Sequence, residues 1–358
     1  MRHKLARGVL PFVAHGTAAK PYSSPSRWFH CLPAAQGEQL TEVYKNNDFQ
    51  LTGITVSKSG RMFVNFPRWS DKYRNAVVEV MKDGSTKPYP DSNWNIWDMK
   101  AASAGDHFVC VQSVVTDDTD TLWVIDPAAP LLASIVPGGP KLVRIDLATN
   151  KITNVYRFGP DTAKTNSYLN DVRVDTNRKF AYMTDSGAGG IVVLDLNTGI
   201  AHRALDGNPS VMAEKGVQIS VNGKPVVGPN GKTPQINSDG IALSHDGESL
   251  YYKPLTGAML YRIKTGLLRN ASASPAAISA GVEKVAKTFP SDGLWMDAQD
   301  RIYIGSINES TIYRIVKGKM EKLASDPRLE WPDTFSQGPD GRMYISASHI
   351  NDGPQFAP

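Results

Sequence analysis

The fold is decided by residues 168–187, which read YLNDVRVDTNRKFAYMTDSG. Two apolar segments flank the polar turn DTNRK, a pattern typical of a β-hairpin. Asn170 and Asp171 precede the first strand, and Asp185 and Ser186 follow the second. A buried hairpin with polar groups gathered at one end indicates that this end faces a ligand, an ion or solvent.

The same pattern occurs six times along the chain. The copies begin at residues 53, 113, 171, 240, 293 and 334, and read GITVSKSGRMFVNFP, SVVTDDTDTLWVIDP, DVRVDTNRKFAYMTD, GIALSHDGESLYYKP, GLWMDAQDRIYIGS and TFSQGPDGRMYISA. Five copies are followed by a second strand–turn–strand unit, such as KLVRIDLATNKITNVY or GIVVLDLNTGIAHRA. Repeated four-stranded units predict an all-β fold, a six-bladed β-propeller.

The last copy has no second hairpin, because the chain ends soon after Ala347. An uncovered edge strand invites unwanted pairing. We therefore predict that the ring is closed by an N-terminal strand that pairs in the last blade, and assign this role to residues 37–46. The predicted organisation is a tail or degenerate secretion signal over residues 1–36, followed by one propeller domain over residues 37–358. The segment GLLRNASASPAAISAGVEKVA is predicted to be an insertion between blades with one helical turn.

Composition narrows the possible partners. The 358 residues are 41% hydrophobic and 21% charged, with 39 basic and 35 acidic residues of interspersed sign. Without a concentrated basic patch, nucleic acid is not an expected partner. No apolar stretch approaches the length of a membrane span. The basic N-terminus favours a secreted or periplasmic location over a cytoplasmic one, and the sequence does not define an oligomeric state. A disulfide between Cys31 and Cys110 remains open.

Propeller geometry places the residues before each first strand and those after each second strand around one mouth of the central channel. The candidate catalytic residues there are Asp171, Asp239, Asp292, Lys253 and His349. The candidate substrate-binding residues are Asn170, Asp185, Asn237, Trp69, Arg68, Asn308 and Asp333. Each Asp or Asn could instead cap a turn through its own backbone. Convergence of several carboxylates favours a site, because buried like charges need a cation, a proton or hydrogen-bond donors.

The stretches LNDVRVDTNRKFAYMTDSG, INSDGIALSHDGESLYYKPLTG, GRMFVNFPRW and QSVVTDDTDTLWVIDP resemble the major royal jelly protein/yellow family over residues 40–350. This resemblance implies a six-bladed, often secreted propeller. Some members of that family are associated with dopachrome conversion, a tautomerisation, and others are nutritive or binding proteins. Fold alone does not fix the chemistry.

A more distant likeness is to the senescence-marker/gluconolactonase group, in which a divalent cation lies on the propeller axis. The matching metal ligands here would be Asn170, Asp239 and Asp292, while Thr52 stands where that group has a Glu. Oxygen ligands suit Ca²⁺ or another divalent cation such as Mg²⁺.

Three functions remain open for a small-molecule substrate or ligand. The first is an enzyme that performs proton-transfer isomerisation or metal-assisted lactone hydrolysis. The second is a binding protein without turnover. The third is a templating enzyme, similar to a cyclase or pericyclase, that uses the channel without a metal.

Overall fold

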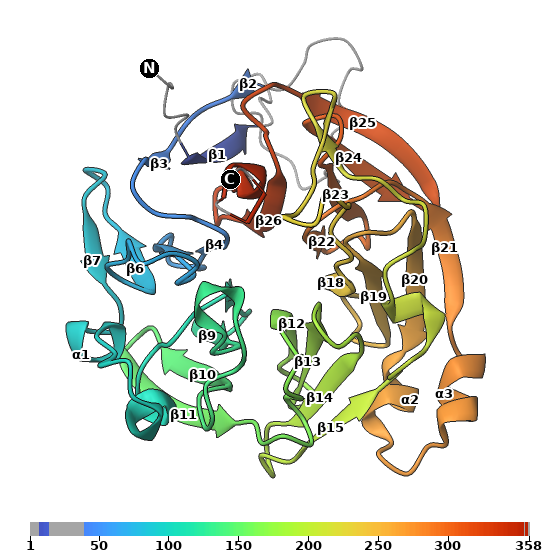
Figure 1. The fold of residues 1–358 in the computed structure, drawn as a ribbon, viewed down its shortest axis with the longest axis horizontal. Helices are drawn as coiled ribbons and strands as arrows, with labels where there is room; N and C mark the ends of the chain where they lie inside the picture. Colours follow the sequence, from blue (N-terminus) through green and yellow to red (C-terminus); the bar gives the residue numbers. More distant parts are fainter. Residues whose placement is uncertain (1–6, 14–38, 354, 357–358) are drawn as a thin grey trace, which may run out of the picture.

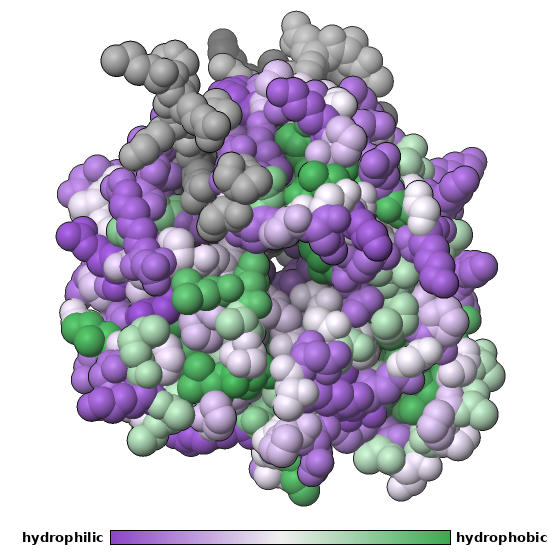
Figure 2. All heavy atoms as spheres, viewed as in Figure 1, coloured by the Kyte–Doolittle hydropathy of each residue, from purple (hydrophilic) through white to green (hydrophobic). Residues whose placement is uncertain are grey.

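The computed structural model describes residues 7–13, 39–353 and 355–356. In the described part of the chain, strands are grouped in sheets around a central axis, and the few helices are short and peripheral (Figure 1). The predicted all-β propeller class is confirmed. The face seen in Figure 1 is hollowed near its centre, and apolar residues gather beside the hollow (Figure 2).

Five sheets are regular four-stranded antiparallel blades. In chain order, the first regular blade contains β4 (Ile54–Val56), β5 (Met62–Asn65), β6 (Val77–Val80) and β7 (Thr86–Pro88), and the second contains β8 (Ser113–Thr116), β9 (Thr121–Asp126), β10 (Lys141–Asp146) and β11 (Lys151–Arg157). The third contains β12 (Leu169–Asp175), β13 (Phe180–Asp185), β14 (Ile191–Asp195) and β15 (Ala201–Ala204), and the fourth contains β18 (Ser238–Leu243), β19 (Ser249–Pro254), β20 (Met259–Lys264) and β21 (Glu283–Lys287). The fifth contains β22 (Leu294–Met296), β23 (Ile302–Ser306), β24 (Thr311–Val316) and β25 (Lys319–Ser325). The regular blades thus number five rather than the six predicted.

The sixth hairpin lies in a composite sheet built from both ends of the chain. Its strands are β26 (Pro332–Gln337), β27 (Met343–Ala347), β1 (Arg7–Val13), β2 (Gln39–Leu40) and β3 (Tyr44–Asn46). The strand beside β27 is β1, and both β2 and β3 pair with β1. The prediction that residues 37–46 supply the pairing strand was therefore wrong. The strand RGVLPFV occupies that edge, although its position suggested a tail or signal.

The six hairpin turns share one backbone feature. Each has a residue with positive φ immediately or shortly before its second strand; these are Gly60, Asp120, Lys179, Gly247, Asp300 and Gly341. Gly, Asp and Asn are the residues that most readily adopt this left-handed conformation, which tight turns between twisted strands require. Five of the six residues are Gly or Asp, so the turn signal in the sequence had this physical basis in five copies, and Lys179 is the exception.

A short β-ribbon, three short helices and four 3₁₀ turns lie in the loops that connect or follow the strands of the described chain. A two-stranded ribbon, β16 (Ser220–Val221) with β17 (Lys224–Pro225), lies between the third and fourth regular blades in sequence. The helices are α1 (Ser92–Asn95), α2 (Thr265–Arg269) and α3 (Pro275–Ala280), and the 3₁₀ turns are η1 (Ala101–Asp106), η2 (Pro130–Leu132), η3 (Pro209–Val211) and η4 (Ile350–Asp352). Helices α2 and α3 lie in the predicted helical insertion, but this insertion separates β20 from β21 within one blade, so the prediction that it lies between blades was wrong.

The hydrophobic core lies between neighbouring blades rather than at one centre. For example, Leu122 and Val124 of β9 pack with Phe63 of β5, whereas Trp123 and Ile125 of β9 pack in the cluster that contains Val172 of β12. This alternation buries both faces of the blade, as the period of a strand requires. Among the described residues, no helix is long and apolar enough to cross a membrane.

Of the two cysteines, Cys110 is buried, while Cys31 lies outside the described residues, so the possible disulfide between them stays a prediction.

Candidate functional site

A cavity of about 250 Å³ lies at one mouth of the channel. Its wall is mainly apolar and aromatic, formed in part by Trp69, Tyr168, Leu255, Trp331 and Ile350. Its polar lining includes residues that belong to inner strands of three blades or directly precede them: Asn170, Asp239 and Asp292. An apolar pocket with a few convergent polar groups is the usual form of a small-molecule site.

The pairing is irregular at the start of three inner strands, β12, β18 and β26. The register shifts between Leu169 and Val172, between Ser238 and Ile241, and between Pro332 and Phe335. The residues skipped in the three registers include Asn170, Asp239 and Asp333 respectively. A β-bulge redirects side chains, and bulges occur frequently next to active sites.

Close packing of backbones around the axis depends on the glycines that follow two of the aspartates. A Cβ on Gly240 would lie 2.5 Å from the backbone oxygen of Asp292, and one on Gly293 would collide with the backbone oxygen of Asp333. Backbone oxygens cannot move aside as a flexible side chain can. Glycine at these positions therefore lets three neighbouring sheets bring their aspartates together.

We expect Gly240→Ala to destabilise the protein by about 1–3 kcal/mol, the usual cost of overpacking. Gly159→Ala is the matched control, since no atom outside its chain neighbours lies within 4 Å of its would-be Cβ. Urea unfolding of the two variants tests the point. Equal stabilities would show that the sheets can separate at the axis without cost.

The axial aspartates are buried and close enough to influence one another. Burial raises the pKa of Asp239 well above its usual value, and the charges of Asp292, Asp333 and Asp171 raise it further. Burial also raises the pKa of Asp333 well above its usual value, again with help from Asp292 and Asp171. The pKa of Asp292 is raised by burial too, but the Trp331 indole opposes this rise by donating from Nε1 to Oδ2 at 2.7 Å.

Lys253 is the buried cation of this region. Burial lowers the pKa of Lys253 to about 7, although Asp239 and Asp292 favour its charged form. Its Nζ donates to the backbone oxygen of Pro254 at 2.8 Å, and its side chain is fully buried. The predicted set Asp239, Asp292 and Lys253 is thus brought together, with Lys253 behind the aspartates rather than in the cavity lining.

Asn170 joins this group directly. Its Nδ2 donates to Oδ2 of Asp239 at 2.8 Å and to Oγ of Ser186 at 3.1 Å. The predicted contact of Asn170 with the end of the second strand is therefore present through Ser186.

Asp171 and Asp333 are buried on the axis but do not line the cavity. Asp171 accepts from the hydroxyl of Ser113 and forms an ion pair with Arg173 at 3.3 Å. Asp333 Oδ1 accepts from Thr334 Oγ1 at 3.1 Å, whereas its Oδ2 has no hydrogen-bond partner among the described residues. These two carboxyl groups lie behind the cavity rather than in its lining.

Several predicted binding residues have structural contacts elsewhere. Asp185 is fully buried against Arg203 at 2.8 Å, and Asn237 bridges the Ala213 amide and the Gly187 carbonyl. Asn308 accepts from the amide of Ser220, and Arg68 stacks on Tyr73 at 4.1 Å. Among the described residues, none of these four lines the cavity.

The structure also places the two remaining predicted site residues, Trp69 and His349. Trp69 does line the cavity, and its Nε1 donates to the hydroxyl of Tyr168 at 2.8 Å. His349 is buried near Glu330 and Asp352 and does not line the cavity.

Sequence reasoning missed several wall residues. Tyr168 donates to Oε1 of Gln112 at 2.9 Å, and Trp331 holds Asp292. Both aromatic residues lie one or two positions before the polar residues that start an inner strand, so their spacing was a usable signal. Ile350 and Phe356 follow the last repeat, where the pattern gave no information.

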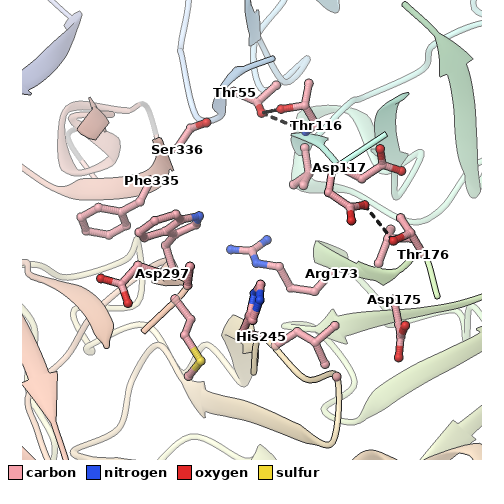
Figure 3. Close-up of a pocket in the computed structure, with 18 of the residues that line it drawn as sticks. Thr55, Thr116, Asp117, Arg173, Asp175, Thr176, His245, Asp297, Phe335 and Ser336 are labelled. Carbon is pink, nitrogen blue, oxygen red and sulfur yellow. Dashed lines mark hydrogen bonds between the residues drawn. The ribbon is translucent and has the colours of Figure 1, made fainter. Parts of the chain in front are cut away.

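A second cavity, of about 340 Å³, occupies the opposite end of the channel. Figure 3 shows the Arg173 guanidinium pointing into it, near His245. Because Arg173 also pairs with Asp171, this side chain lies between the second cavity and the buried axial carboxyl groups. His245, which lies in the turn between β18 and β19, also lines this second cavity.

The axial residues partly fit the divalent cation that a gluconolactonase-like propeller implies. Asn170, Asp239 and Asp292 offer oxygen ligands of the kind that Ca²⁺ and Mg²⁺ prefer, and Asp333 Oδ2 is an unpartnered buried oxygen close behind them. Thr52 does not complete the set. Its hydroxyl donates to the Gln112 carbonyl at 2.9 Å and accepts from Asn65 Nδ2 at 2.8 Å.

The fold and the site together define a β-propeller with an acidic, aromatic-walled cavity on its axis. The chain belongs to the major royal jelly protein family, whose profile matches residues 109–336. It is 24% identical over 208 residues to major royal jelly protein 1 of Apis mellifera, a match that covers 54% of this chain and 45% of that protein. The chain thus matches less than half the length of this curated relative.

Solved structures show the fold alone. A gluconolactonase from Xanthomonas campestris superposes with a TM-score of 0.51 at 12% identity, over 83% of this chain and 86% of that one. A chain of a nidogen/laminin complex superposes with a TM-score of 0.52 at 8% identity, over 83% and 88% of the two chains. At such low identity the likeness in fold does not indicate a chemistry.

Proposed function

We propose that this protein binds a small, planar polar molecule in the axial cavity and catalyses a proton-transfer isomerisation of it, of the tautomerase type. The observation that carries this proposal is the pair Asp239 and Asp292, two neighbouring buried carboxyl groups in an otherwise aromatic and apolar wall. Two carboxyl groups whose environments differ can serve as acid and base at the same pH.

The two aspartates differ in what surrounds them. Asp292 accepts from the Trp331 indole, which stabilises its ionised form, so it suits the role of base. Asp239 has its pKa raised well above the usual value, by burial first and by Asp292 second, so it suits the role of acid. Each positioned acid or base contributes about 10²–10⁴-fold to such a reaction.

Other side chains would bind and orient the substrate. Trp69, Tyr168 and Trp331 offer faces against which a planar ring can pack. Asn170 holds Asp239 through its amide, and Lys253 supplies positive charge behind both carboxyl groups. No nucleophile is needed, because tautomerisation moves a proton from one atom of the substrate to another.

Metal-assisted lactone hydrolysis is the second candidate, and the contact between Asn170 and Asp239 favours it. Asn170, Asp239 and Asp292 would hold a divalent cation, and the buried negative charge of the region would stabilise it. A bound cation supplies an activated water for hydrolysis. Ligand carriage without turnover and a metal-free templating enzyme are outcomes of the same test.

The proposed site also requires the composite sheet to act as a sixth blade. Asp333 is the second residue of its inner strand β26, and Ser346 Oγ of the same sheet donates to the backbone oxygen of Thr52 at 2.6 Å, beside the first regular blade. These contacts support a composite sheet that acts as the sixth blade, in which β1 pairs with the last hairpin and both β2 and β3 pair with β1.

The test compares the wild type with Asp292→Asn, using Asp340→Asn as an exposed control in the same half of the chain. We expect the wild type to convert an oxidised catechol such as an aminochrome, followed by absorbance, and Asp292→Asn to be slower by at least about 10². Equal rates in the wild type and Asp292→Asn would contradict the proposal.

Elemental analysis of the same samples separates the alternatives. About one equivalent of calcium that is lost in Asp292→Asn, together with turnover of a lactone, would replace isomerisation by hydrolysis. Tight ligand binding without turnover of either substrate would identify a carrier.

A further inference from the structure

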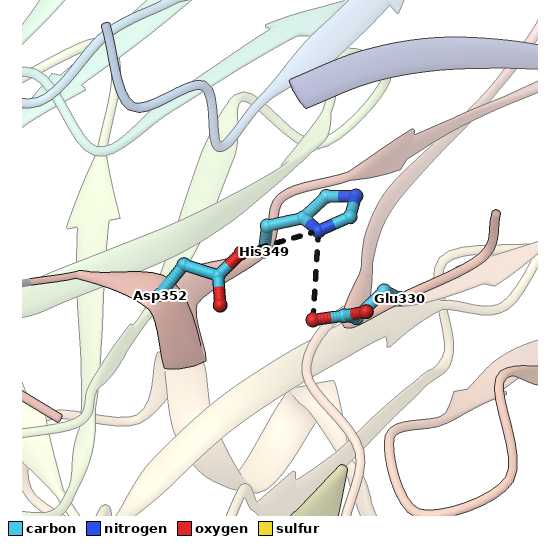
Figure 4. A group of neighbouring side chains, drawn as sticks. All are labelled: Glu330, His349 and Asp352. Carbon is cyan, nitrogen blue, oxygen red and sulfur yellow. Dashed lines mark ion pairs between the residues drawn. The ribbon is translucent and has the colours of Figure 1, made fainter. Parts of the chain in front are cut away.

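A second group of ionisable side chains lies away from the axial cavity, at the C-terminal end of the propeller. Glu330 precedes β26, His349 follows β27, and Asp352 ends the 3₁₀ turn η4. One ligand atom of each residue lies within 4.8 Å of the others. Figure 4 shows one imidazole nitrogen of His349 facing both carboxyl groups.

The distances fit a shared ion better than direct hydrogen bonds. His349 Nδ1 is 3.5 Å from Glu330 Oε1 and 3.7 Å from Asp352 Oδ2. Hydrogen bonds from nitrogen to oxygen are normally about 2.7–3.2 Å long. Ligands bonded to Zn²⁺ at about 2.0–2.2 Å lie roughly 3.3–3.6 Å apart at the corners of a tetrahedron. The separations are therefore close to the edges of such a coordination shell.

The histidine nitrogen is an independent observation that points to a ligand. His349 is 6% exposed, and its Nδ1 has no hydrogen-bond partner in the part of the chain that the structure describes. A buried polar atom without a partner is costly, so native structures rarely leave one. With a neutral imidazole, the two carboxylates carry a charge of −2, which a divalent cation would balance.

The carboxylates are also held in position by amides. Asn351 Nδ2 donates to Glu330 Oε1 at 2.7 Å and to Asp352 Oδ1 at 3.2 Å. Asn222 Nδ2 donates to Glu330 Oε2 at 3.0 Å. Hydrogen bonds that orient the ligands in this manner are characteristic of protein metal sites.

We propose that His349 Nδ1, Glu330 and Asp352 bind a divalent transition-metal ion of the Zn²⁺ class. Imidazole favours Zn²⁺ over Ca²⁺ and Mg²⁺, which take oxygen ligands. This ion is separate from any cation on the axis, since the two sites share no ligand. Its binding would fix η4, whose Ile350 lies between the ligands in sequence and lines the axial cavity. The ion would thus hold one wall of that cavity in place.

The experiment uses the full chain, stripped of metal with a chelator and returned to chelator-free buffer. It is titrated with Zn²⁺ by calorimetry, and Co²⁺ is used as a spectroscopic probe of the ligand set. We expect one equivalent of Zn²⁺ to bind the wild type. Asp352→Asn and His349→Gln should weaken binding at least about tenfold, and the Co²⁺ absorption of the complex should change.

Two control variants make the assignment specific. Asp340→Asn removes an exposed carboxylate of the same chain segment, and Asp292→Asn removes a carboxylate of the axial site. Both variants should still bind one equivalent of Zn²⁺. The Asp352 side chain is 36% exposed, so its isosteric change is compatible with folding, which near-ultraviolet circular dichroism verifies. Absence of Zn²⁺ binding by the wild type would overturn the proposal, as would equal binding by Asp352→Asn. Loss only in Asp292→Asn would place the ion on the axis instead.

Discussion

Replacing Lys141 with methionine is expected to lower the free energy of unfolding by about 3–5 kcal/mol, the usual cost of leaving a buried charge without its partner. Lys141 Nζ lies 2.9 Å from Asp126 Oδ2, and neither side chain is exposed to solvent. The ammonium also donates to the backbone oxygens of Ala104 and Gly139. Methionine has a similar length but provides none of these three hydrogen bonds.

In this variant three backbone amides continue to donate to Asp126, including that of Ala128 at 2.9 Å. The amide of Val109 donates at 2.7 Å and that of Cys110 at 3.0 Å. These contacts anchor the segment that leads to Gln112 in the cavity wall. We therefore expect the loss of stability to be accompanied by weaker ligand binding.

Urea unfolding at neutral pH measures the effect, with Lys151→Met as a control at an exposed position of β11. Adding Asp126→Asn to Lys141→Met should recover part of the lost free energy, since the second change removes the uncompensated charge. A cost below about 1 kcal/mol for Lys141→Met, typical of a surface pair, would contradict this account.

The sequence predicted the repeated part of the fold well, because its signals are local. A polar turn between two apolar strands can be recognised from about fifteen residues, and all six of these hairpins are present. Closure of the ring depends instead on a pairing between Arg7–Val13 and Met343–Ala347. Nothing local in either segment specifies that partner, so residues 37–46 were assigned wrongly to that position.

The same distinction explains the candidate site. Position before an inner strand predicted that Asn170, Asp239 and Asp292 share the channel mouth, and propeller geometry alone brings them there. Position after a second strand predicted a site role for Asp185, but the residue is fully buried beside Arg203. The two kinds of aspartate look alike in the sequence, because the difference lies in a contact partner from another strand.

Replacing Asp239 with asparagine is expected to increase the stability of the folded protein near neutral pH while lowering its turnover by about 10²–10⁴-fold. Burial and the neighbouring carboxylates raise the pKa of Asp239 in the folded state well above its usual value. Below the unfolded pKa of about 3.8 the carboxyl is protonated in both states, and its full contribution to stability is present. As pH rises through the folded pKa, that contribution is lost, because the folded protein must hold a buried charge.

Asparagine is uncharged, keeps the shape of the aspartate and can still accept from Nδ2 of Asn170. We therefore expect Asp239→Asn to exceed the wild type by about 1–3 kcal/mol at pH 7, a typical gain when a poorly compensated buried charge is replaced. The difference should shrink toward pH 4. Urea unfolding across this range, with a chelator present so that no cation compensates the site, gives the measurement.

Lys253 changes the stability of the folded protein with pH in the opposite direction to Asp239. The unfolding experiment separates the effect of Lys253 from that of the aspartates, because the two effects fall in different pH ranges. Burial lowers the pKa of Lys253 to about 7, so stability is gained as pH rises from about 7 toward its unfolded value near 10.4. Between pH 4 and pH 7 the change in the free energy of unfolding therefore reports on the aspartates rather than on Lys253. If Asp239→Asn were less stable than the wild type at pH 7, the carboxylate would be a net stabilising group. Asp239 would then be an ionised carboxylate that stabilises the fold, and it would not be the protonated acid that the proposed proton transfer requires.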